Sequence, residues 1–272
     1  MKLLTFGSSW TQGTGASYTD GMTLEEYKVA CCIAGETPYD KDHNNPLTWK
    51  SLLAEKNGWE LTTYARVGSS NMRNFRKMTE VLDGTDAAET IVLVGVPHLA
   101  RHELYMNDDS VGFNPSGKGY VGVLYANGYG NNANKFKTKD FDMFKYVKNH
   151  YNEQNETEQL QYNIAHWNRY LTNLGYKVFW YDELNQIKYT TVPDNYLFTD
   201  KDDRSLMTML AIDAGWTPEE DTDHSGQSMH QDCKRAKYLV EKKAVNPHAI
   251  LPTAASQAKI ADWMDAAIKA KM

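Results

Sequence analysis

Residues 90–96, with the sequence TIVLVGV, constrain the fold more than any other segment of the chain. The segment carries no charge and is rich in β-branched residues. A continuous run of this kind is typical of a parallel strand whose sheet is covered on both faces by helices. We therefore predict that residues 90–96 form the central strand of an α/β domain.

Strand-like and helix-like segments alternate on both sides of this run. Further strands are predicted at residues 3–6, 59–65 and 176–181. Patterns with one apolar helical face predict helices near residues 24–30, 46–58, 71–84, 155–174, 200–214 and 225–243. This alternation predicts a doubly wound, flavodoxin-like α/β fold, in which a parallel sheet is flanked by helices.

Functional sites in such sheets lie beyond the carboxyl ends of the strands. Three predicted loops follow strand ends of this kind: residues 7–15, 66–71 and 97–103. Asn, Gly, Tyr and Lys become frequent at residues 106–139, which predicts an insertion with one hairpin arm at residues 120–125. An apolar face at residues 253–270 predicts an extra C-terminal helix. The chain has 272 residues without an internal repeat or a linker, so we expect a single domain over residues 1–272.

The composition excludes several classes of partner. Lys and Arg number 29 and Asp and Glu number 35, and the resulting net charge of −6 does not supply the basic field of a nucleic-acid binder. No apolar run approaches the roughly 18–20 residues of a membrane span, and the first residues do not resemble a signal peptide. Cys31, Cys32 and Cys233 lack metal-ligand spacing and are typical of reduced thiols. We expect a cytoplasmic protein with no nucleic-acid or membrane partner.

Two serines, Ser8 and Ser9, follow the first predicted strand in a loop of small residues. A hydroxyl at such a point can stand beside free backbone N–H groups, which is what a catalytic nucleophile requires. Serines after a strand also serve as turn formers and helix caps, and that interpretation stays open. The loop lacks both the Lys-Ser/Thr ending of a phosphate-binding loop and the spacing of a dinucleotide-binding loop.

An acid and a base lie together near the other end of the chain. Asp221 precedes His224 by three residues, ahead of a predicted helix. At this spacing the carboxylate can hold the imidazole in its reactive tautomer. In one alternative, Asp221 and Asp223 cap the helix and His224 is solvated. In another, these residues and His230 hold a metal ion, although the spacing matches no standard ligand pattern. His230 is also an alternative base.

The segments described so far resemble the sequence blocks of the SGNH, or GDSL-type, hydrolases. Residues 6–13, FGSSWTQG, look like the first block, with Ser9 at the nucleophile and Ser8 where an Asp is usual. Residues 65–71, ARVGSSN, are similar to the second block, whose glycine, here Gly68, supplies an oxyanion-binding N–H. Residues 221–224, DTDH, are similar to the last block, Asp-x-x-His.

The third block departs from the family pattern. That block reads Gly-x-Asn-Asp/Glu, and residues 95–98 of this chain read GVPH, so the expected Asn of the oxyanion hole is absent. Removing one oxyanion donor costs on the order of 100- to 1,000-fold in other hydrolases. Asn71 and His98 are the candidates to replace it. Trp10, in the same loop as Ser9, and His98 are candidate substrate contacts.

The resemblance implies a serine esterase in which Ser9 attacks an ester, His224 acts as base and Asp221 orients it. It implies no metal or cofactor, and a small-molecule or glycan ester, such as an acetyl ester, as the substrate. First blocks like this one, with a replaced third block, point to a phage or bacterial protein. The alternative is a non-catalytic structural or binding protein, such as a virion component, that retains the fold. Virion partners and homo-oligomers both stay open.

Overall fold

The computed structural model describes residues 1–31, 45–97, 99, 101–106, 119–124, 152–184, 189–198, 205–217, 234–248 and 250–272. Its main sheet is parallel, with the strand order β2-β1-β3-β6. These strands are β1 (Lys2–Phe6), β2 (Glu60–Thr63), β3 (Thr90–Val96) and β6 (Lys177–Asp182). Every residue of β3 is buried, and its bounds are those predicted from the sequence. The predicted α/β class with a doubly wound parallel sheet is therefore confirmed.

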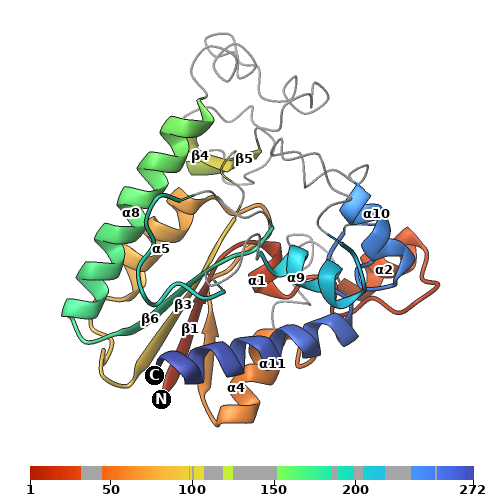
Figure 1. Cartoon of the computed structure of the whole chain (residues 1–272), viewed down its shortest axis with the longest axis horizontal. Coiled ribbons are helices and arrows are strands. Elements are labelled where there is room, and N and C mark those ends of the chain that lie inside the picture. Colours follow the sequence, from red (N-terminus) through yellow and green to blue (C-terminus); the bar gives the residue numbers. More distant parts are fainter. Residues whose placement is uncertain are drawn as a thin grey trace.

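Helices cover both faces of the sheet, as Figure 1 shows. One face packs against α5 (Asn71–Val81) and α8 (Glu153–Asn173). The other face packs against α4 (Trp49–Asn57), α9 (Leu206–Asp213), α10 (Lys234–Glu241) and α11 (Ala254–Lys271). Alternate strand residues point to opposite faces. Leu93 therefore lies on the face covered by α4, α9, α10 and α11, and Val94 lies on the face covered by α5 and α8. Trp49 is fully buried in the core, as its position on a helix predicts.

Several helix ends differ from the pattern-based bounds because the cap residues differ. At α2 (Leu24–Cys31), Thr23 and Glu26 form a capping box, in which the Thr23 N–H donates to Glu26 Oε2 at 2.8 Å. In α8, the cap is Asn152, whose Oδ1 accepts the Asn155 N–H at 3.0 Å. This helix therefore begins at Glu153, two residues before the start predicted from the sequence.

Two of the predicted loops contain regular structure. Residues 7–15 include the one-turn helix α1 (Ser9–Gln12). The loop predicted at residues 97–103 is shorter than expected, because β4 (Arg101–Met106) begins inside it and pairs antiparallel with β5 (Gly119–Leu124). Most of the predicted insertion at 106–139 lies outside the described residues.

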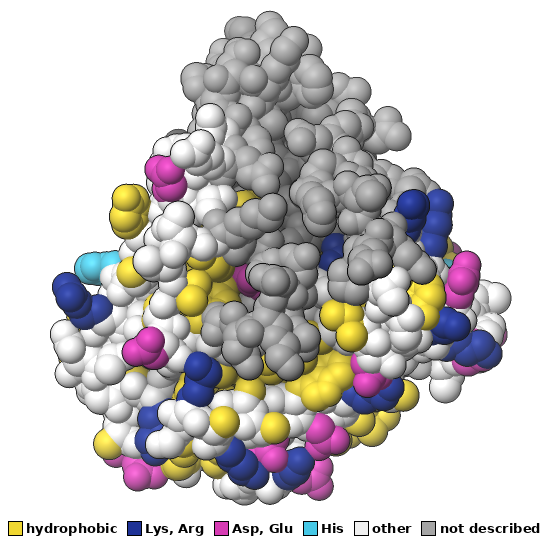
Figure 2. Space-filling model, viewed as in Figure 1, with side chains coloured by type: hydrophobic (Ala, Val, Ile, Leu, Met, Phe, Trp, Pro, Cys, Tyr) yellow, Lys and Arg dark blue, Asp and Glu magenta, His cyan; other side chains and the backbone are white. Residues whose placement is uncertain are grey.

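The described surface carries charges of both signs. On the face drawn in Figure 2, Lys and Arg side chains alternate with Asp and Glu side chains along the lower rim. No helix in the described part of the chain combines the length and the apolar character needed to cross a membrane. The thiol of Cys31 is buried and donates to the carbonyl of Lys28 at 3.8 Å, whereas Cys32 and Cys233 lie outside the described residues.

Helices α4 and α11 are joined by a nearly buried carboxylate. The side chain of Asp265, on α11, is 8% exposed and lies 3.0 Å from Lys56 Nζ on α4. It also accepts hydrogen bonds from Asn57 Nδ2 at 2.9 Å and from Lys269 Nζ at 3.0 Å. Burial by itself raises the pKa of Asp265, but the hydrogen bonds from Lys269, Asn57 and Lys56 outweigh it and lower this pKa from 3.8 to about 2.

This lowered pKa predicts a pH-dependent stability. The charged form of Asp265 is favoured by folding, so its contribution is present above pH 3.8 and is lost as the pH falls toward about 2. We expect Asp265→Asn to lower the free energy of unfolding by about 2 kcal/mol at pH 7 and by progressively less below pH 4. Urea unfolding at pH 7 and pH 3 measures this difference. Asp262→Asn is the control, because Asp262 contacts the same Lys56 but its side chain is 71% exposed. A deficit for Asp265→Asn that does not shrink at low pH would contradict the assignment.

Candidate functional site

The site is built around the turn that joins β1 to α1 at the carboxyl edge of the sheet. Gly7 follows β1, Ser8 occupies the N-cap position of α1, and Ser9 is the first helical residue. Ser8 is fully buried, whereas 7% of Ser9 is exposed. The two neighbouring hydroxyls therefore have different surroundings.

The hydroxyl of Ser8 is bound to a buried carboxylate, that of Glu183. Glu183 follows β6 and is fully buried. Its Oε1 accepts the Ser8 N–H at 2.8 Å, and its Oε2 accepts the Ser8 hydroxyl in a short hydrogen bond. Among the described residues, hydrogen bonds, and no ion pair with Lys or Arg, compensate the burial of this carboxylate.

Thr11 supplies two more donors to the same carboxylate. The Thr11 N–H donates to Glu183 Oε1 at 3.2 Å, and the Thr11 hydroxyl donates to the same oxygen. The Tyr181 hydroxyl in turn forms a short hydrogen bond with Thr11 Oγ1. Burial, followed by the charge of Glu183, raises the pKa of Tyr181 well above its usual value. Tyr181 therefore stays protonated and donates to Thr11, which donates to Glu183.

The hydroxyl of Ser9 is not used in this network. Within the described part of the chain it has no hydrogen-bond partner, and the same holds for the Ser9 N–H. A hydroxyl without a hydrogen-bond partner among the described residues, beside an N–H group that likewise has none there, is available for nucleophilic attack on a carbonyl. Of the two serines, the structure therefore favours Ser9 over Ser8 as a nucleophile.

The loop that follows β2 is fastened to this turn on both sides of Ser9. The Arg66 N–H donates to the carbonyl of Gly7 at 3.1 Å, and the Val67 N–H donates to Gln12 Oε1 at 2.7 Å. Gly68 comes next, with a left-handed φ of 75° and open space where a Cβ would stand. Its N–H has no acceptor among the described residues and belongs to the same edge of the sheet as Ser9.

A buried lysine supports the far end of α1. Lys50 is fully buried, and its Nζ donates to the carbonyl of Gln12 at 2.7 Å and to Thr48 Oγ1 at 3.2 Å. A cation near the last carbonyls of a helix interacts favourably with them. The side chain of Gln12 also accepts the Val67 N–H. By binding Gln12, Lys50 therefore helps to keep α1 in contact with the loop that carries Gly68.

Asn71 lies near the end of β3, where the third sequence block lacks its Asn. It is half-buried, begins α5, and its Nδ2 is 3.4 Å from the carbonyl oxygen of Pro97. At this distance the hydrogen bond is weak, so the carboxamide can turn toward another acceptor at little cost. Ser9 thus follows β1, Gly68 and Asn71 both follow β2, and Asn71 contacts the end of β3 through Pro97.

The remaining predicted site residues divide into two groups. Asp221, His224, His98 and the alternative base His230 lie outside the described residues. Trp10 is described, but it is 1% exposed and its ring packs in the core against residues that include Trp49. Because the ring is buried in the core between the sheet and α4, it is not available for the substrate contact that its loop position suggests.

Glu183 is the residue that the sequence interpretation missed. A signal was present, because Asp182 and Glu183 come directly after a predicted apolar strand, at the edge where sites form. Acidic residues at a strand end are ordinary loop residues when taken alone. Only the structure brings Glu183 against Ser8 and Thr11.

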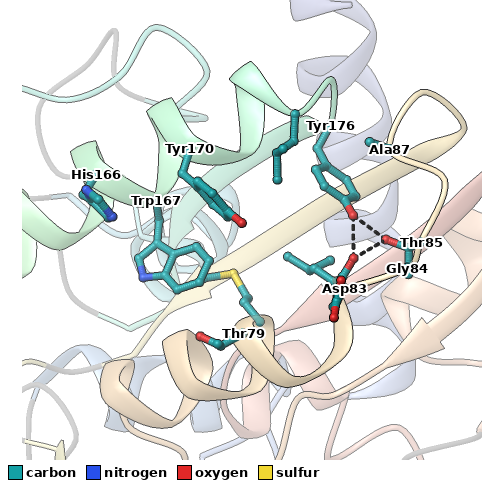
Figure 3. A pocket seen from close by; sticks show the side chains of 12 residues that line it. Thr79, Asp83, Gly84, Thr85, Ala87, His166, Trp167, Tyr170 and Tyr176 are labelled. Atoms are coloured by element: carbon teal, nitrogen blue, oxygen red, sulfur yellow. Dashed lines mark hydrogen bonds between the residues drawn. The ribbon is translucent and has the colours of Figure 1, made fainter.

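A separate groove of about 670 Å³ lies at the opposite, amino edge of the sheet, between α5 and α8 (Figure 3). Trp167, Tyr170 and Tyr176 form its aromatic lining, and no serine or cysteine lines it. The hydroxyls of Thr79 and Thr85 donate to backbone carbonyls at 3.1 and 2.9 Å. The groove therefore offers no serine or cysteine nucleophile, and the candidate active site is the edge that carries Ser9.

Comparisons with known proteins add little to this picture. No protein-family model matches the sequence, and no curated protein matches it. A solved structure of a carbohydrate esterase, whose active site "displays divergent catalytic and non-catalytic binding functions", aligns over 98% of this chain and 68% of its own. The sequence identity is 10% and the TM-score is 0.41. A likeness this weak carries no argument about this chain.

Proposed function

We propose that this protein is a serine esterase of the SGNH type that removes a small acyl group, such as acetyl, from a glycan or a similar ester. The observation that carries the proposal is the contrast between the two serines of the β1–α1 turn. The Ser8 hydroxyl is bound to Glu183, whereas the Ser9 hydroxyl has no partner among the described residues. The order of the sequence blocks supports the same assignment.

The proposed reaction is a two-step acyl transfer. The Oγ of Ser9 attacks the ester carbonyl carbon while His224 takes the hydroxyl proton, and the carbonyl π electrons move onto oxygen. When the intermediate collapses, the C–O bond to the alcohol breaks and the alcohol takes the proton from His224. Water, deprotonated by His224, then attacks the acyl-serine and releases the acid. Asp221 orients His224 and stabilises its charged form.

The N–H groups of Ser9 and Gly68 are the proposed oxyanion donors. Asn71 Nδ2 is the proposed third donor, in place of the Asn that the third block lacks. Three observations support this set: Arg66 is hydrogen-bonded to Gly7, Val67 is bonded to Gln12, and Asn71 lies beside Pro97. Donors held in advance at the developing charge stabilise it without reorganisation in the transition state.

The resemblance to the SGNH hydrolases favours a small acyl group, and the course of the chain after β3 indicates where the alcohol part of the ester would be recognised. The antiparallel pair β4–β5 follows β3 from the edge at which Ser9 lies. Segments in this position of a parallel sheet commonly contribute to substrate choice.

Covalent labelling tests the nucleophile. A fluorophosphonate probe is expected to modify the wild-type protein once, on the peptide that contains Ser9, and an activated acetyl ester and an acetylated oligosaccharide are expected to be hydrolysed. Ser9→Ala should prevent labelling, and His224→Ala should slow it strongly. Ser51→Ala, which removes a half-buried hydroxyl on α4, is the control and should label like the wild type.

Three experimental results would each contradict part of the proposed mechanism. Labelling that persists in Ser9→Ala would refute the nucleophile assignment. A wild-type protein that neither labels nor hydrolyses either ester would instead favour a non-catalytic structural or binding protein. Full activity in His224→Ala together with its loss in His230→Ala would move the role of base to His230.

A further inference from the structure

We propose that Glu183 is a positioning residue of this active site: it holds the first turn of α1 so that the Ser9 hydroxyl and N–H face the substrate. The inference rests on the proposed esterase function. It concerns a residue that the sequence blocks do not include, and its carboxylate comes from the end of β6 instead of from the turn itself.

The first turn of α1 is capped by a side chain from another strand of the sheet. A helix usually begins with a cap side chain that accepts the N–H of its third residue. Ser8 occupies the cap position of α1 but makes no such bond. The N–H of Thr11, the third helical residue, goes instead to Glu183 Oε1 at 3.2 Å. Glu183 therefore caps α1 from another strand of the sheet, and Ser8 is free to donate its hydroxyl to Glu183 Oε2.

The Glu183 cap fixes backbone N–H groups on both sides of Ser9. Glu183 binds the N–H of Ser8 and the N–H of Thr11, one residue before and two residues after Ser9. With both flanking amides fixed, the direction of the Ser9 N–H and of its Cα–Cβ bond is fixed as well. A misplacement of about 1 Å at a reacting group can cost on the order of 100-fold in rate.

An effect of Glu183 through its charge and an effect through its hold on the turn predict opposite changes in kcat when Glu183 is neutralised. A buried negative charge near a developing oxyanion raises the energy of that oxyanion. If Glu183 acted on the reaction only through its charge, neutralising it would therefore raise kcat. If it acts by holding the turn, neutralising it weakens bonds that are about twice as strong with a charged acceptor as with a neutral one, and kcat falls. The sign of the change in kcat separates the two roles.

The test compares Glu183→Gln with a matched substitution in the next residue. Asp182 is also a buried carboxylate of β6, 5% exposed, but its Oδ1 accepts the Tyr196 hydroxyl at 2.6 Å on the other face of the sheet. Glu183→Gln is expected to lower kcat for the activated acetyl ester by about 10- to 100-fold with KM changed less than about 3-fold. Asp182→Asn is expected to lower stability and leave kcat within about 2-fold.

A second variant and a second measurement keep the test decisive. Ser8→Ala removes only the hydroxyl bond to Glu183 Oε2 and keeps both amide bonds, so kcat should fall only a few-fold. Amide hydrogen exchange of residues 8–12 reports the turn without any turnover. Protection there should decrease in Glu183→Gln and stay unchanged in Asp182→Asn.

Each outcome decides between the proposals. An unchanged or increased kcat in folded Glu183→Gln overturns the positioning role, as does unchanged protection of residues 8–12. An equal loss of kcat in Asp182→Asn also overturns it, because the effect would then follow general stability. Decreased protection in a protein whose wild type neither labels nor hydrolyses esters refutes the esterase and, with it, the catalytic role of Glu183.

Discussion

Ester hydrolysis is expected to fall below detection in Ser9→Ala, with binding of the substrate little changed. Loss of a serine nucleophile that acts with a His base costs on the order of 10⁶-fold in kcat, because only the oxyanion donors and substrate binding remain. The substitution removes a single hydroxyl that has no hydrogen-bond partner among the described residues, so the fold should be unaffected. Initial rates with an activated acetyl ester, together with a thermal melt, measure both effects.

Ser8→Ala is the matched comparison for this prediction. It removes the neighbouring hydroxyl, which is fully buried and bonded to Glu183. We expect lower stability and only a few-fold loss of kcat, the reverse of the Ser9→Ala pattern. A complete loss of turnover in Ser8→Ala with activity retained in Ser9→Ala would exchange the roles of the two serines.

A large loss of stability is expected in Gly95→Ala. A Cβ at Gly95 would lie 2.6 Å from Glu183 Oε1 and 2.7 Å from the Tyr181 hydroxyl, and it would also press on Thr11 Oγ1. All three side chains are fully buried and joined to one another by hydrogen bonds, so they have little freedom to move aside. We expect a cost of about 3 kcal/mol in the free energy of unfolding and a melting temperature lower by roughly 5–10 °C. Displacement of Glu183 should lower kcat in the same variant.

The control for this prediction is Gly84→Ala. A Cβ at Gly84 meets no atom within 4 Å, although φ is 77° there. Its cost is therefore limited to the backbone penalty of about 1–2 kcal/mol for a left-handed residue. Thermal melts and urea unfolding of the two variants give the comparison. If Gly95→Ala is no less stable than Gly84→Ala, the tight packing around Glu183 is incorrect.

The sequence predicts the sheet well because strand signals are local. Residues 90–96 carry their own β-branched pattern, and the segment appears as β3 without any shift of its ends. Helix ends are predicted less accurately, since the choice of cap depends on the exact residue that closes the first turn. In α8, both Asn152 and Asn155 are good cap residues, and only the contact from Asn152 Oδ1 to the Asn155 N–H selects between them.

The candidate site is predictable where a single turn carries it and not where distant strands meet. Ser9 and Gly68 follow predicted strands, so both could be assigned to the carboxyl edge of the sheet. The helical conformation of residues 9–12 could not be predicted from the turn-rich sequence, because its cap comes from Glu183. The close approach at Gly95 depends on the same distant residue. Trp10 is expected from the sequence to contact the substrate because it lies in the same turn as Ser9, but its side chain points into the core.

The bond between Ser8 and Glu183 also constrains when the site can form during synthesis. The two residues are 175 positions apart, and β6 joins the sheet only after β1, β2 and β3 have been made. Ser9 leaves the ribosome well before β6, yet its turn lacks its cap until β6 has emerged. Contacts of such long sequence separation form late and slowly. A nascent chain that ends before residue 183 would therefore carry the nucleophile without the geometry proposed to make it reactive, and reactivity toward esters would mark the completion of the sheet.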